Sequence, residues 1–155
     1  MIVENISQRP GRRVHVVQGE HYVTDDPDVR AFFEFSEIQQ PFDDSRAARA
    51  ARLLRAVTEA RPEIAGMLLA NGEERWLSND IKPITRDPLV DERWYRDAVQ
   101  EPGEVLLLPR PIGRNLRGAY SADDIVSIVK AVVDPRTART RGVVLIDMRL
   151  AVVEE

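Results

Sequence analysis

The stretch EIAGMLLANGEERWLS, residues 63–78, decides the fold class. Its central pair, Asn71-Gly72, is typical of a tight turn whose residues need positive φ angles, and it separates two runs of strand length. Along the first run, Met67 and Leu69 would face one side of a sheet and Leu68 the other. The pattern therefore predicts a β-hairpin, and with it an antiparallel sheet.

Downstream, two β-branched runs repeat this arrangement. Residues 125–133 and 142–148 are rich in valine and isoleucine, and the polar segment 134–140 between them predicts a second hairpin with a longer connection. A short apolar run at 104–108 ends before Pro109 and predicts a further strand. Together with the first hairpin, these runs predict five strands.

Helical patterns precede the first hairpin. Asp25 and Asp26 stand before Pro27, a favourable first helical residue, and predict a helix from Pro27 to about Gln39. A second helix is expected from the acidic caps at 43–44 to about Arg61, with its apolar residues on one stripe: Ala50, Leu53, Leu54 and Val57.

Between the hairpins, Asp91 is expected to cap a short helix whose apolar face carries Trp94, Tyr95 and Ala98. Residues 79–88 and 110–120 read as irregular connections. The order of helices, hairpin, short helix, strand, loop and hairpin predicts an α+β domain, in which the N-terminal helices pack on one face of the sheet.

Composition excludes several classes of function. The 155 residues hold no cysteine, so a disulfide scaffold and a thiolate metal site are excluded, and the 22 basic and 26 acidic residues argue against a nucleic-acid binder. The two histidines, His15 and His21, lack the partners of a catalytic triad or a metal site. No glycine-rich phosphate loop occurs. We therefore expect no catalytic apparatus, no metal and no cofactor.

Two groups of residues could bind a ligand. Trp94 and Tyr95 could stack on a small molecule, or they could simply pack their helix onto the sheet; spacing alone weighs the two equally. Arg110, Arg114 and Arg117 lie in the loop after a strand and could bind an anion. Because 20 of the 22 basic residues are arginine, a solvated surface is the simpler interpretation of this loop.

Four segments taken in order resemble a known family: Trp94–Ala98, Tyr120–Asp124, Ile128–Asp134 and Gly142–Met148. They resemble Cache domains, the PAS-like extracytoplasmic sensor modules of bacterial histidine kinases and chemoreceptors. The resemblance spans about residues 29–150. It implies a PAS-like antiparallel sheet of five to six strands with N-terminal helices on one face.

The resemblance also implies a ligand pocket between the sheet and the segments around the short helix. The expected ligand-binding residues are Trp94, Tyr95, Arg110, Tyr120 and Asp147. In the branch of the family that binds amino acids, an arginine stands two positions before the tryptophan and a tyrosine seven before it. This chain has Glu92 and Asp87 there. The departure favours another small molecule, or no ligand.

We therefore expect a non-catalytic, extracytoplasmic domain that senses a small molecule for a membrane-bound two-component histidine kinase, with a homodimeric parent protein. The alternatives are a chemoreceptor ectodomain and a standalone binding or dimerisation domain. The expected organisation is an N-terminal segment (1–26), a single sensor domain (27–150) and a tail (151–155) leading to a missing membrane-proximal part. No nucleic-acid partner is expected.

Overall fold

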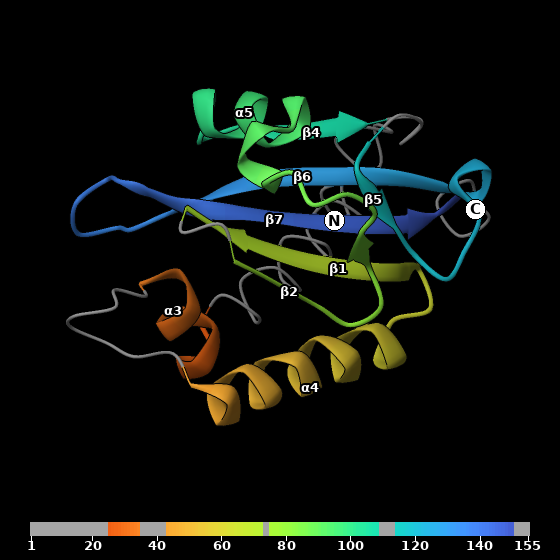
Figure 1. Cartoon of the computed structure of the whole chain (residues 1–155), viewed down its shortest axis with the longest axis horizontal. Helices are drawn as coiled ribbons and strands as arrows, with labels where there is room; N and C mark the ends of the chain where they lie inside the picture. Colours follow the sequence, from red (N-terminus) through yellow and green to blue (C-terminus); the bar gives the residue numbers. More distant parts are fainter. Residues whose placement is uncertain (1–24, 35–42, 73–74, 109–113, 151–155) are drawn as a thin grey trace.

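A five-stranded antiparallel sheet with the order β2-β1-β7-β6-β4 forms the centre of the computed structural model, which describes residues 25–34, 43–72, 75–108 and 114–150 (Figure 1). Its strands are β1 (Ile64–Asn71), β2 (Trp76–Ser78), β4 (Val105–Leu108), β6 (Ile125–Val133) and β7 (Thr140–Arg149). The predicted α+β class and five-stranded sheet are confirmed.

Both predicted hairpins form. The first joins β1 to β2, with Leu68 opposite Ser78. Asn71 does not have the positive φ predicted for a two-residue turn: it is the last residue of β1, and its backbone N–H donates to the carbonyl oxygen of Arg75. The second hairpin joins β6 to β7, and β7 pairs with β1 on its other side. Strand β7 is therefore the middle strand of the sheet, and it is paired along most of its length on both edges.

The two N-terminal helices begin at aspartate caps. The Asp26 carboxylate accepts hydrogen bonds from the backbone of α3 (Pro27–Phe33), which starts with proline. Asp43 caps α4 (Asp44–Ala60) in the same way. That helix ends at Ala60, because Pro62 holds Arg61 in an extended conformation.

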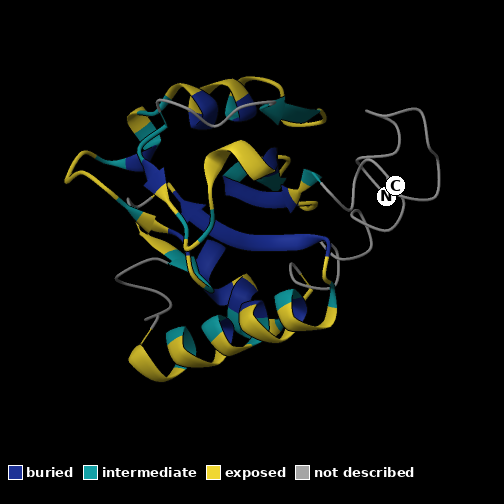
Figure 2. Ribbon diagram, turned by 90° about the vertical axis from the view of Figure 1, so that its right-hand side faces the viewer, coloured by how far each residue is buried: buried dark blue, intermediate teal, exposed yellow. Residues whose placement is uncertain are grey.

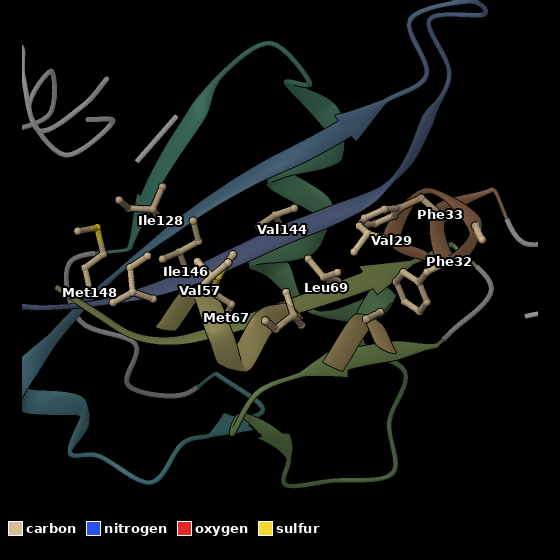
Figure 3. Close-up of a cluster of buried hydrophobic side chains, with 14 of the residues drawn as sticks. Val29, Phe32, Phe33, Val57, Met67, Leu69, Ile128, Val144, Ile146 and Met148 are labelled. Carbon is tan, nitrogen blue, oxygen red and sulfur yellow. The ribbon is translucent and has the colours of Figure 1, made fainter. Parts of the chain in front are cut away.

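Two hydrophobic clusters lie on opposite faces of the sheet. On one face, α3 and α4 cover Met67 and Leu69 of β1 together with Ile128 and Ile146 (Figure 3). On the other face, helix α5 (Arg93–Gln100) packs in a cluster with Leu68, Val129 and Leu145. Alternate residues of each strand thus enter different clusters, as the sequence pattern predicts. Figure 2 shows the central strands buried and the outer side of α4 exposed.

Several local predictions were wrong. Helix α3 ends at Phe33 rather than Gln39, since Glu34 already leaves the helical conformation; residues 35–42 lie outside the described residues. Asp91 does not cap α5: it closes the single turn η1 (Leu89–Asp91), and Glu92 occupies the N-cap position without a side-chain capping bond, its carboxylate accepting instead from the backbone N–H of Asn115.

The connections predicted to be irregular contain a small second sheet. Strand β3 (Lys82–Pro83) pairs antiparallel with β5 (Leu116–Arg117). These two-residue strands are too short to leave a periodic signal in the sequence. They tie together two segments that are far apart in the chain, and they hold the segment after Arg114 against the main sheet. No helix in the described part of the chain is long and apolar enough to span a membrane.

Candidate functional site

Asp147 is the centre of a buried polar network on the α5 side of the sheet. It lies on β7, directly opposite Ser127 on β6, and is fully buried. On its other side it pairs with Gly66 of β1. Leu145 and Val129, the next residues of β7 and β6 toward α5 on the same face, belong to the apolar cluster there.

Four hydrogen bonds satisfy this carboxylate. The Arg114 guanidinium binds it through two nitrogens, with Nη1–Oδ1 at 2.7 Å and Nη2–Oδ2 at 2.6 Å. The Tyr120 hydroxyl donates to Oδ2 at 2.5 Å and the Ser127 hydroxyl to Oδ1 at 2.6 Å. A carboxylate offers about four acceptor positions. The protein therefore occupies all of the hydrogen-bonding capacity of Asp147.

Arg114 carries the compensating charge. Its side chain is only 7% exposed, and Nη1 also donates to Ser127 Oγ at 2.9 Å. Burial opposes the charge of the guanidinium, but the hydrogen bonds and negative charge of Asp147 outweigh it, so the pKa of Arg114 is raised above its usual value. The pair is thus a charged, bidentate contact held in a low-dielectric environment.

Glycines make room for Tyr120. A Cβ added at Gly66 would overlap the Tyr120 hydroxyl, and one added at Gly118 would overlap the Tyr120 ring. Gly66 lies at an irregularity in the pairing of β1 with β7, beside Asp147. The missing side chain at this position therefore allows the phenol to reach across the sheet to the carboxylate.

The environment also controls the protonation of Tyr120. Burial and the negative charge of Asp147 both disfavour the phenolate, and the pKa of Tyr120 is raised well above its usual value. The hydroxyl therefore acts only as a neutral donor toward Asp147 under ordinary conditions.

Because the folded chain holds Tyr120 protonated, its pKa is higher in the folded than in the unfolded state. The associated stability is complete below about pH 10, the ordinary tyrosine pKa, and is lost as the pH rises above it. We expect the free energy of unfolding to fall by up to about 1.4 kcal/mol per pH unit in this range because of Tyr120. Tyr120→Phe should reduce that slope in urea unfolding measured at several alkaline pH values. An unchanged slope would contradict the assignment.

A pocket of about 520 Å³ opens beside this network. Arg114 and Tyr120 line it, together with Arg117, Ser121 and the apolar side chains of Leu116 and Ile125. The lining contains two arginines and no carboxylate among the described residues. Asp147 does not line the pocket; it lies behind Arg114 and Tyr120 and fixes both.

Of the five predicted site residues, the structure brings Tyr120 and Asp147 into direct contact. Trp94 and Tyr95 lie on α5, 5% and 6% exposed, in the apolar cluster on the same face of the sheet. Their rings meet edge to face, with centroids 5.9 Å apart. Within the described part of the chain, neither ring bonds to Asp147 or lines the 520 Å³ pocket. Arg110 lies outside the described residues.

The aromatic pair has its own unusual features. The Trp94 indole N–H is buried, and no hydrogen-bond acceptor reaches it within the described part of the chain. Burial raises the pKa of the Tyr95 hydroxyl. Packing and ligand stacking both agree with this placement, because each requires a buried aromatic surface.

Sequence reasoning missed Ser127 and weighed Arg114 only as a possible surface anion binder. A signal for Ser127 does exist, since Ser127 and Lys130 are the two polar residues of an otherwise apolar strand. The partner of such a residue depends on strand register, which the sequence does not fix. Arg114 could not be distinguished by residue type, because arginine is frequent throughout this chain.

Comparisons with known proteins bear on the fold. No protein-family model matches the sequence, and no curated protein matches it. Among solved structures, the ligand-binding domain of an amino acid chemoreceptor of Pseudomonas aeruginosa PAO1, in complex with GABA, has a TM-score of 0.58 at 16% identity. That match covers 97% of this chain and 60% of the other.

Two further ligand-binding domains are similar. One comes from a chemoreceptor of Campylobacter jejuni in complex with L-norvaline, with a TM-score of 0.56, 8% identity, and coverage of 98% of this chain and 56% of the other. The other comes from a chemoreceptor of Pseudomonas fluorescens in complex with L-serine, with a TM-score of 0.53, 15% identity, and coverage of 97% and 56%. This chain therefore spans less than two thirds of the length of these domains. At such identities the likeness establishes the fold.

Proposed function

From the Cache-like fold of this chain, which it shares with chemoreceptor ligand-binding domains, we propose that it is an extracytoplasmic domain that senses a small molecule. The proposed parent is a homodimeric, membrane-bound two-component histidine kinase, and the segment itself has no catalytic role. Fold alone does not define function, so the proposal depends on the site.

The observation that carries the proposal is the pocket of about 520 Å³ whose wall includes a pre-oriented arginine. Its volume lies within the range of small-molecule sites. Asp147 holds the Arg114 guanidinium through two hydrogen bonds, so the side chain loses little further freedom when a ligand arrives. Arg117 on β5 adds a second positive charge to the lining.

These groups favour a ligand that carries an acidic group. An arginine fork and a hydroxyl group are suitable donors for a carboxylate, and Arg117 and Ser121 supply them on the lining, since the Arg114 fork and the Tyr120 hydroxyl already donate to Asp147. An ammonium group on the ligand is disfavoured, because Asp147 already accepts hydrogen bonds from four protein donors. It would have to displace Arg114 and leave a buried charge without its partner.

A signal would start with Arg114 and Tyr120. Both lie on the segment around β5, Arg114 just before that strand and Tyr120 after it, and both are bonded to β7. A ligand that binds one arrangement of this segment more tightly would shift the population toward it. Such a change would reach the middle strands of the sheet directly.

The chemoreceptor alternative is favoured by one observation: the similar solved structures named above are chemoreceptor domains. The same pocket would serve either parent protein. The sequence that follows residue 155 in the parent reading frame separates the two, because a kinase and a chemoreceptor have different cytoplasmic parts.

A thermal-shift screen tests the proposal. The panel contains organic acids, amino acids, sugars and amines. A ligand present at 100 times its Kd should stabilise the domain by about 2.7 kcal/mol. We expect an acid among the hits, and we expect Arg117→Gln to abolish its shift. Arg52→Gln, which makes the same change on the exposed side of α4, should leave the shift intact. The absence of any hit, or an equal shift in both variants, would contradict the proposal.

A further inference from the structure

A second and larger cavity lies at the other end of the sheet. Its volume is about 940 Å³, and its lining residues come from α3, from the turn after α5 and from the β6–β7 hairpin. Arg141 on its wall and Asp147 in the polar network are six residues apart on β7. At about 3.4 Å per residue, the two places are roughly 20 Å apart. This cavity is therefore separate from the pocket at Arg114.

The floor of the cavity is apolar, and its charged groups carry a positive excess of one, with Arg136 paired to Glu34 and Asp134. Phe33, Pro102 and Val133 contribute hydrocarbon surface. The charged lining consists of four cations and three anions: Arg30, Lys130, Arg136 and Arg141 against Asp25, Glu34 and Asp134. The whole chain has a net charge of −4, so this lining is opposite in sign to the average surface.

Asp134 is already engaged within the lining. Its carboxylate accepts hydrogen bonds from the backbone N–H of Arg136 at 2.9 Å and from Arg141 Nη2 at 3.2 Å. These contacts hold the pKa of Asp134 below its usual range. Asp134 thus orients Arg141, and its own buried carboxylate is occupied by protein donors.

Arg141 has unused donor capacity. Its Nε–H is buried and has no hydrogen-bond partner within the described residues. A buried donor without an acceptor is costly, so such a group is normally satisfied by protein, water or ligand. Here it belongs to a residue that lines a cavity with apolar side chains on its floor.

We propose that this cavity is a second ligand site, which takes a small organic anion with an apolar body, its acidic group at Arg141 and its hydrocarbon part against Phe33 and Val133. The site does not depend on the pocket at Arg114. Its volume matches the upper range of small-molecule sites. Arg30, at the exposed edge, would contribute long-range attraction for the acid.

Benzoate is a suitable probe, and benzamide is its neutral counterpart of the same shape. We expect benzoate to bind the full chain and benzamide to bind at least about tenfold more weakly, since the charge-assisted hydrogen bonds are lost. Arg141→Gln and Arg30→Gln should each weaken benzoate binding. Arg117→Gln, in the other pocket, should leave the benzoate Kd unchanged to within about twofold because the sites are distant.

If Arg141→Gln fails to fold, chemical-shift mapping of the wild-type chain can still locate the benzoate site. Benzoate should perturb the amides of α3 and of residues 131–141. The proposal is overturned if benzoate does not bind, if benzamide binds equally well, or if the perturbed amides lie around Tyr120. The last result would leave the proposed sensing pocket intact while removing the second site.

Discussion

Asp147→Asn is expected to lower the free energy of unfolding by about 3–5 kcal/mol, because it leaves the buried Arg114 guanidinium without its counter-charge. The side chain of Arg114 is 7% exposed and that of Asp147 is fully buried, so water cannot replace the lost partner without moving the segment. The amide also presents an N–H₂ group toward donors from Tyr120 and Ser127. Urea unfolding followed by circular dichroism measures the loss.

The matched control is Asp123→Asn. Asp123 is an exposed acid in the turn before β6, so the same chemical change should alter stability by less than about 0.5 kcal/mol. A double variant, Arg114→Met with Asp147→Leu, should recover part of the loss, since it removes both charges together. If Asp147→Asn unfolds at the same urea concentration as the control, the network does not stabilise the fold.

Trp94→Ala should lower the free energy of unfolding by about 3–5 kcal/mol, because it removes a buried ring from the cluster beneath α5. Trp94→Phe should cost clearly less. Phenylalanine keeps part of the ring and removes an N–H group that has no acceptor within the described part of the chain. Unfolding midpoints of the two variants, measured side by side, separate packing from hydrogen bonding.

Trp76→Ala is the control for residue type. Trp76 lies on the edge strand β2 and is 39% exposed, so it should cost much less than Trp94→Ala. Equal costs at the two positions would show that Trp94 is not an important part of the core. If Trp94→Phe lowers the free energy of unfolding as much as Trp94→Ala does, the indole N–H donates a hydrogen bond that stabilises the fold, and the packing explanation is wrong.

The elements that could be predicted from the sequence are those with strong local chemistry. The aspartates before Pro27 specify a helix start, and the apolar run before Asn71-Gly72 specifies one strand of a hairpin, although Asn71 itself stays in that strand. The predicted alternation of Met67 and Leu68 between the two faces of the sheet is also confirmed. In each case the determining contacts lie within a few residues along the chain.

The site was less predictable because its contacts are distant in sequence. Arg114 and Asp147 are 33 residues apart, and their pairing depends on strands β3 and β5, which are only two residues long. Asp147 itself was found through a family resemblance, which implied a ligand contact. In the structure the same carboxylate holds protein donors, and its link to a ligand through Arg114 stays a prediction.

The position of Asp147 on the middle strand has a consequence for hydrogen exchange. Strand β7 is paired on both edges, so its amides can exchange with deuterium only through large openings of the sheet. The segment with Arg114 and Tyr120 is bonded to β7 through side chains, while its two-residue strand β5 pairs with β3. A ligand bound to that segment would hold it against β7. The amides of the segment would then exchange more slowly, as those of β7 already do.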